Sequence, residues 1–165
     1  MKSILLVRHA KSSWEDFSLP DIDRPLNNRG KRDAPEMAER LIEKKLEVDA
    51  FISSPAKRAR KTAEIFSKAF GNKKKDVDIN EDLYEAGQAD FEKVIASIPD
   101  EHSVVALFSH NPGITEYANT LTSTRIDNIP TSGIFAVQAE TDSWENFASA
   151  QKQLLFFDYP KNAID

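Results

Sequence analysis

The segment ILLVRHAKSS, residues 4–13, decides the fold class of this chain. Its first four residues are aliphatic, and such an uninterrupted run is typical of a parallel strand buried on both faces of a sheet. An arginine, a histidine and small polar residues follow directly. In open α/β sheets, ligands bind beyond the carboxyl ends of the strands. The segment therefore predicts a buried strand that delivers Arg8 and His9 to a ligand site.

The two residues at this strand end suit phosphoryl chemistry. Arg8 offers a planar fork of donors that matches a phosphate group. His9 can attack phosphorus or carry protons near neutral pH, because the ordinary pKa of imidazole is about 6.5. Many strands also end in an Arg-His pair without such a role. The pair therefore needs support from the rest of the chain.

Composition excludes several classes of function. A length of 165 residues fits one domain, which we expect to span residues 1–165. The net charge of −5 does not favour nucleic acid or an anionic membrane as a partner. Because the chain has no cysteine, disulfides and thiolate catalysis are excluded. The aliphatic run before Arg8 is too short for a signal-peptide core, so we expect a cytoplasmic protein.

Segments with strand character alternate with segments of helical spacing. The predicted strands lie at residues 4–7, 48–53, 77–84, 103–109, 134–139 and 153–159. The predicted helices lie around residues 37–46 and at 54–70, 90–98 and 114–121. A short polar connection makes the last two strands antiparallel neighbours. The pattern predicts an α/β protein, a three-layer α/β/α sandwich whose mostly parallel central sheet contains an antiparallel strand.

Polar residues recur at the ends of the predicted strands. His110 follows the strand at 103–109 just as His9 follows the first strand, so both imidazoles face one crevice if these strands are neighbours. Arg58 lies near the start of the helix after the second strand, whose backbone N–H groups would reach the same edge. Taken singly, each of these residues is more often structural or a solvated charge. Together with Arg8 they predict a pocket for a dianionic phosphate.

Three motifs resemble the histidine phosphatase (phosphoglycerate mutase-like) superfamily. The sequence LVRHA at residues 6–10 is similar to the RHG signature of that superfamily. The sequence SSPAKRARKTA at residues 53–63 is similar to its SSPxxRAxxTA segment. The sequence SHNPG at residues 109–113 resembles its second histidine motif. The three motifs occur in the order and at the spacing of the short members of the superfamily.

Further features resemble the phosphohistidine phosphatase branch. They are the short chain, the sequence RHAKSSW at residues 8–14 and the sequence RPLNNRG at residues 24–30. Ala10 stands where many members have glycine. Since alanine adopts positive φ less readily than glycine, we expect an ordinary backbone conformation at this position.

The resemblance implies a phosphoglycerate mutase-like fold and a set of roles. His9 would be the nucleophile and would form a transient phosphohistidine. Arg8, Arg58 and His110 would bind the phosphate oxygens and offset their charge in the transition state. No metal or other cofactor is expected, because the cations and imidazoles supply the positive charge.

Glu85, Arg24 and Ser12 complete the candidate site. In mutase-like relatives a carboxylic acid in the middle of the chain protonates the leaving group, and Glu85 lies in the corresponding stretch. The alternative is that Glu85 is an exposed turn residue. Arg24 either contacts the substrate or anchors its loop by pairing with Asp21 or Asp23. Ser12, one of the small polar residues after the first strand, is a candidate substrate contact.

The sequence predicts a phosphatase that acts on phosphohistidine in a protein or on a small phosphorylated metabolite. The short chain favours the protein substrate, because it leaves little sequence to enclose a metabolite. The alternative from another class is a non-catalytic module that binds a phosphorylated ligand. Such a module predicts the loss of His9 or of one cation, and all of them are present. The oligomeric state does not follow from the sequence.

Overall fold

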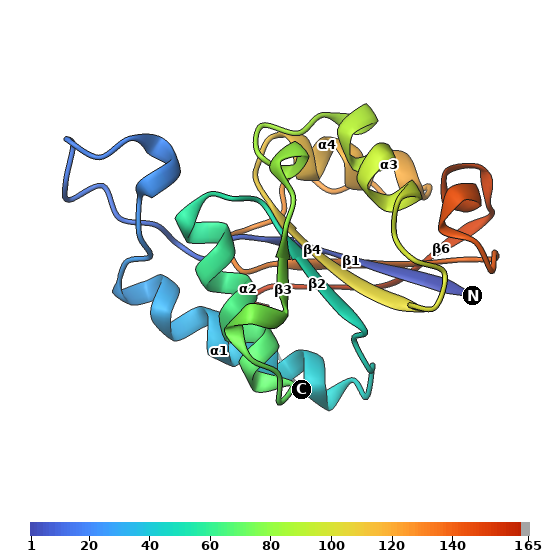
Figure 1. Ribbon diagram of the computed structural model, residues 1–165, viewed down its shortest axis with the longest axis horizontal. Coiled ribbons are helices and arrows are strands. Elements are labelled where there is room, and N and C mark those ends of the chain that lie inside the picture. The colour runs from blue at the N-terminus through green and yellow to red at the C-terminus, as the bar shows by residue number, and fades with distance from the viewer. Residues whose placement is uncertain (163–165) are drawn as a thin grey trace.

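The computed structural model describes residues 1–162, which form a six-stranded sheet between two layers of helices (Figure 1). The sheet has the order β3-β2-β4-β1-β5-β6. Its strands are β1 (Lys2–Arg8), β2 (Ala50–Ser53), β3 (Val77–Ile79), β4 (Val104–Ser109), β5 (Ile134–Ala139) and β6 (Lys152–Asp158). Only β5 runs against the other strands in this sheet, since both β1 and β6 pair with it in antiparallel fashion. The predicted sandwich with a mostly parallel sheet is confirmed.

The helices cover both faces of the sheet. One face carries α1 (Asn28–Glu43) and α2 (Lys57–Ala69), and the other carries α3 (Gln88–Ala96) and α4 (Gly113–Leu121). Successive residues of a strand face opposite sides. Leu5 of β1 therefore packs in the cluster with α1 and α2, whereas Leu6 packs in the cluster with α3 and α4. Burial on both faces holds β1 in place and sets where its carboxyl end emerges.

Three predicted segments differ from the structure. The helix predicted around residues 37–46 starts earlier, at Asn28, because the side chain of Asn27 accepts a hydrogen bond from Gly30 N and caps it. The strand predicted at residues 77–84 ends at Ile79, because the side chain of Asn80 accepts a hydrogen bond from the backbone N–H of Asp82 and starts a 3-10 turn, η3 (Glu81–Leu83). The connection between β5 and β6 is more than a polar turn. It contains a 3-10 segment, η4 (Trp144–Ser149), whose aromatic side chains are buried beside α3.

A long loop leads from β1 to α1 and stands clear of the sandwich at the left of Figure 1. This β1–α1 loop spans residues 9–27 and contains a 3-10 turn, η1 (Asp21–Asp23). Backbone hydrogen bonds join its two arms, from Ser13 N to Pro25 O (2.8 Å) and from Asn27 N to Lys11 O (3.0 Å). The loop is therefore closed at its base. No helix within residues 1–162 is long and apolar enough to cross a membrane.

Candidate active site

Two neighbouring parallel strands bring the histidines together. Arg8 of β1 lies in register with Ser109 of β4, and His9 N donates a hydrogen bond to Ser109 O over 3.2 Å. The next residue of each strand end is a histidine. The ring centroids of His9 and His110 are 5.1 Å apart. The two strand ends therefore place the imidazoles side by side, as the sequence pattern predicts.

His9 is buried with one ring nitrogen engaged. Its Nδ1 lies 2.8 Å from the carbonyl oxygen of Ala10, and a carbonyl can only accept, so Nδ1 carries the proton and Nε2 is left with a free lone pair. Burial lowers the pKa of His9 to about 3, although the hydrogen bond to Ala10 raises it. The neighbouring ionisable groups of His110, Arg58 and Arg8 lower it further. His9 is therefore a neutral base near pH 7.

One threonine hydroxyl joins the peptide after His9 to the first turn of α2. Thr62 Oγ1 accepts a hydrogen bond from Ala10 N (2.9 Å) and donates one to Arg58 O (2.7 Å). Ala10 has an ordinary negative φ, as expected from its place in the motif. The threonine of the SSPxxRAxxTA segment thus connects the peptide after His9 to α2.

His110 is held by a serine at the end of β2. Its Nε2 lies 2.7 Å from Ser54 Oγ, and Ser54 Oγ also accepts a hydrogen bond from Ala56 N. A serine hydroxyl can donate to this nitrogen or accept from it, and in both cases Nδ1 is buried without a partner. Burial and the charge of Arg58 lower the pKa of His110 to about 4. A neutral imidazole with one unpaired ring nitrogen therefore lies beside His9.

The two arginines place positive charge beside the histidines. Arg8 donates from Nη1 to Ile129 O (3.1 Å), while its Nε is buried without a partner. Arg58 is 6% exposed and gives both of its terminal nitrogens to Asp21, to the carbonyl oxygen (2.7 Å) and to Oδ2 (2.9 Å). Burial lowers the pKa of Arg8, and the neighbouring charge of Arg58 lowers it further. Two neighbouring positive charges favour the binding of an anion.

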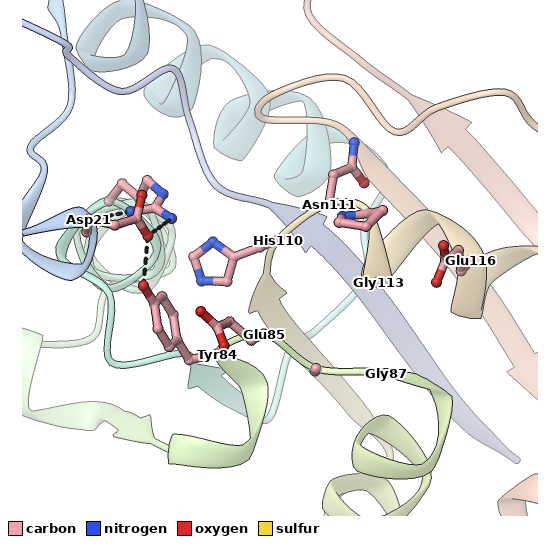
Figure 2. A pocket seen from close by; sticks show the side chains of 11 residues that line it. Asp21, Tyr84, Glu85, Gly87, His110, Asn111, Gly113 and Glu116 are labelled. Atoms are coloured by element: carbon pink, nitrogen blue, oxygen red, sulfur yellow. Dashed lines mark hydrogen bonds and ion pairs between the residues drawn. The ribbon is translucent and has the colours of Figure 1, made fainter.

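Asp21 is the principal site residue that the sequence reasoning missed. Its carboxylate accepts hydrogen bonds from the Tyr84 hydroxyl (2.6 Å), from Arg58 and from Arg24 (3.1 Å). Figure 2 shows the Asp21–Tyr84 hydrogen bond at the cavity, with His110 near the tyrosine ring. These donors, Tyr84 first, hold the pKa of Asp21 well below its ordinary range, and the same hydrogen bond raises the pKa of Tyr84.

Arg24 and Ser12 lie behind this carboxylate. Arg24 is 7% exposed and donates to Asp21 Oδ1, to Ser12 Oγ (2.5 Å) and to Ser13 O (3.1 Å). Arg24 thus makes the pair with Asp21 that the loop-anchoring alternative predicts. The hydroxyl of Ser12 is buried against the same guanidinium, and neither residue lines the cavity beside His110. Arg8 and His9 do not line this cavity either.

A cavity of about 430 Å³ opens beside His110 (Figure 2). It is lined by Asp21, Arg58, Tyr84, Glu85, Ala86, Gly87, His110, Asn111, Pro112, Gly113 and Glu116. Glu85 is exposed, has a positive φ of 56° and lies in this lining. The hydrogen bond from Ser109 Oγ to Leu83 O (2.6 Å) ties the end of β4 to the turn that carries Tyr84 and Glu85. The position of Glu85 therefore fits either role, that of a proton donor or that of an exposed turn residue.

Unpaired polar atoms gather around His9. In residues 1–162, five buried side-chain nitrogen or oxygen atoms have no hydrogen-bond partner, and three of them are Arg8 Nε, His110 Nδ1 and Ser132 Oγ. Ser132 lies beside His9, because its backbone N–H donates hydrogen bonds to the carbonyl oxygens of Arg8 (3.1 Å) and His9 (3.2 Å). Buried polar atoms are almost always paired in folded proteins. Their concentration at one place indicates a site for a polar ligand.

Known proteins resemble this chain in sequence. The family model of the histidine phosphatase superfamily (branch 1) matches residues 4–128. An uncharacterised chloroplast protein of Arabidopsis thaliana is 31% identical over 153 residues, which cover 87% of this chain and 69% of the plant protein. An uncharacterised protein of Mycobacterium leprae is 30% identical over 167 residues, covering 94% of this chain and 100% of the mycobacterial one.

Solved structures share the fold. A candidate phosphohistidine phosphatase SixA from Agrobacterium tumefaciens superimposes with a TM-score of 0.81 at 25% identity, covering 96% of this chain and 98% of its own. The protein histidine phosphatase SixA in complex with tungstate gives 0.77 at 20% identity, with 96% and 97% covered. A mycobacterial glucosyl-3-phosphoglycerate phosphatase gives 0.74 at 15% identity, with 96% and 100% covered. The sequence match over most of the chain, together with the SixA-like fold, shows that this chain belongs to the histidine phosphatase superfamily, in its short SixA-like branch.

Proposed function

We propose that this chain is a phosphatase that acts through a covalent phosphohistidine on His9, and that its substrate is phosphohistidine in a protein. One observation carries the proposal. His9 is buried and neutral with an unprotonated Nε2, it lies beside His110, and Arg8 Nε, His110 Nδ1 and Ser132 Oγ lack hydrogen-bond partners. A tetrahedral phosphoryl group offers the acceptor that the arginine atom requires.

The proposed reaction has two displacements at phosphorus. The lone pair of His9 Nε2 forms a bond to phosphorus while the bond to the leaving nitrogen or oxygen breaks, and that atom takes up a proton. Water then attacks phosphorus, the bond to Nε2 breaks, and inorganic phosphate leaves with His9 restored. Arg8, Arg58 and His110 stabilise the charge on the equatorial oxygens in both steps. Glu85, in the cavity lining, is the proposed proton donor for leaving groups that need one.

The cavity favours phosphohistidine over an acidic metabolite. Its lining contains the carboxylates of Asp21, Glu85 and Glu116, whereas Arg58 is its one basic residue besides His110. A leaving group with a second negative charge would meet like charges there. An imidazole leaving group carries none. The tungstate-bound SixA supports the same reading, while the glucosyl-3-phosphoglycerate phosphatase keeps a small-metabolite phosphatase as the second candidate.

Hydrolysis by matched histidine variants tests the function. We expect the wild-type protein to dephosphorylate a histidine-phosphorylated protein and p-nitrophenyl phosphate in the presence of EDTA, since no step uses a metal. His9→Ala abolishes turnover, with a loss of about 10³-fold or more. His102→Ala, at the third histidine of the chain, is the control and retains activity.

Covalent labelling separates the proposed enzyme from a binding module. A quenched reaction with the labelled protein substrate places phosphate on His9. Phosphate binding by a wild-type protein that turns over no phosphoramidate and no phosphoester would establish the non-catalytic module instead. We further propose that residues 1–165 act as a single cytoplasmic domain without a cofactor, which the EDTA reaction and a cell-fractionation experiment address separately.

A further inference from the structure

Exposed apolar side chains cluster on the β1–α1 loop. Trp14, Phe17 and Leu19 are 60%, 88% and 36% exposed, and we call these three residues the apolar tip. In the rest of the described chain, residues 1–162, the exposed large hydrophobic residues are Met1 and Ile79. Apolar side chains that gather on one surface element mark an interaction site more often than isolated ones do. The apolar tip is therefore a candidate contact surface.

The loop that carries the apolar tip is internally ordered. Its arms are joined at the base by the backbone hydrogen bonds described above. Nearer the tip, the Asp16 carboxylate accepts hydrogen bonds from Ser18 N (2.9 Å) and Ser18 Oγ (2.5 Å). The guanidinium of Arg24 stacks on the Trp14 ring at 3.3 Å from its centroid. A partner would thus meet a surface that is already arranged, which reduces the entropy lost on binding.

Side-chain contacts connect the apolar tip to the candidate active site. Trp14 stacks on Arg24, Arg24 is paired with Asp21, and Asp21 is bonded to Arg58. None of the three apolar-tip residues lines the cavity beside His110. A ligand confined to the cavity therefore leaves them exposed. A larger partner that places one phosphorylated side chain in the cavity has its neighbouring surface beside the loop.

The negative charge of the loop indicates which kind of partner surface would bind it. Residues 13–23 contain Glu15, Asp16, Asp21 and Asp23 and neither lysine nor arginine. Glu15, Asp16 and Asp23 are exposed and make no ion pair with any residue in the described range 1–162. The complementary surface is apolar with basic residues around it.

We propose that the apolar tip is the docking surface for the phosphoprotein substrate, and that it binds apolar and basic residues beside the phosphorylated side chain. The proposal rests on the proposed phosphatase function and adds to it the surface that distinguishes a protein substrate from the free phosphorylated amino acid. The arginines that bind the phosphate contact both substrates. The apolar tip contacts only the protein substrate.

Two substrates with the same reacting bond test the proposal. They are a histone phosphorylated on histidine with phosphoramidate, which is a basic protein, and free N-phosphohistidine. The double variant Phe17→Ser/Leu19→Ser is expected to lower kcat/KM on the histone by about tenfold and on free phosphohistidine by less than about twofold. The control Ile79→Ser, at an exposed apolar residue of β3, changes neither value. Glu15→Lys lowers kcat/KM on the histone alone, by an amount that shrinks as salt is added.

Binding of the same phosphorylated histone to His9→Ala protein provides a second readout that needs no turnover. The apolar-tip substitutions are expected to weaken this binding about tenfold. If they weaken binding while the wild-type protein hydrolyses neither substrate, docking holds and the phosphatase function fails. Equal losses of kcat/KM on both substrates, or no loss on the histone, overturn the docking proposal. It is also overturned if the wild type sediments as a dimer that these substitutions dissociate without changing kcat/KM on the histone.

Discussion

The candidate site has two parts that are built by different means. At the sheet edge, His9 and His110 are fixed by strand register and by hydrogen bonds to backbone or to a buried serine. On the β1–α1 loop, Asp21 and Arg24 are fixed by contacts between charged side chains. His9, His110 and Arg24 are all buried, whereas the Asp21 side chain is about half exposed. The loop therefore reaches the site through a half-exposed carboxylate, which binds Arg58 of α2.

The largest expected effect is at the sheet edge. In the proposed mechanism Arg58 and His110 stabilise charge on the transferring phosphoryl group, so kcat is expected to fall by about 10²- to 10³-fold in Arg58→Ala and in His110→Ala. Arg60→Ala, on the same helix but exposed, is the control for α2. Steady-state kinetics on p-nitrophenyl phosphate measure both. A loss below about tenfold would mean that these residues do not contact the phosphate.

As the pH falls, the histidines at the sheet edge should lower the free energy of unfolding before the loop carboxylate does. In the unfolded chain His9 and His110 protonate near pH 6.5, but in the folded chain their pKa values are lowered to about 3 and about 4. The unfolded state binds more protons between these limits, so the free energy of unfolding falls as the pH drops from about 6.5 toward 4. Asp21, whose pKa is also lowered, adds a loss only below about pH 4.

Urea unfolding at pH 7 and pH 5 measures this difference, which we expect to be about 1–2 kcal/mol for each histidine. His9→Gln and His110→Gln should each reduce the pH dependence, whereas His102→Gln should leave it unchanged. A free energy of unfolding that is constant over this range in the wild type would show that the two imidazoles are not held neutral by the fold.

A smaller effect is expected at the loop. Asp21→Ala removes the partner of Arg58, Tyr84 and Arg24, so kcat/KM for p-nitrophenyl phosphate is expected to fall about fivefold, a modest loss because the carboxylate is half exposed. Asp23→Ala, in the same turn, is the control. An increase in kcat/KM would instead mean that the Asp21 carboxylate competes with the substrate phosphate for Arg58.

The contrast between the two parts also explains what could be predicted from the sequence. Aliphatic runs mark β1 and β4, and strand neighbours share an edge, so the approach of His9 to His110 follows from the pattern. The segment around Arg58 is typical of a helix start. Strand pairing and helix starts are arrangements of the backbone, and each allows few geometries.

Asp21 could not be assigned in the same way. Its contact with Arg58 joins residues 37 positions apart, through a loop whose path depends on side-chain contacts with no sequence period. Its partner Tyr84 was placed in a predicted strand, whereas Asn80 starts a turn there and brings Tyr84 to the cavity. The pairing of Arg24 was one of two stated alternatives, and only the three-dimensional contacts decide between them.

The Thr62 hydroxyl has a consequence for thermal motion at the site. Helices packed on a sheet shift relative to it by small sliding movements. Because this hydroxyl is bonded to Ala10 N and to Arg58 O at once, the peptide beside the nucleophile and the first turn of α2 are linked by a bridge of two hydrogen bonds. We therefore expect sliding of the helix layer to move His9 and Arg58 in the same direction, so that their separation changes little.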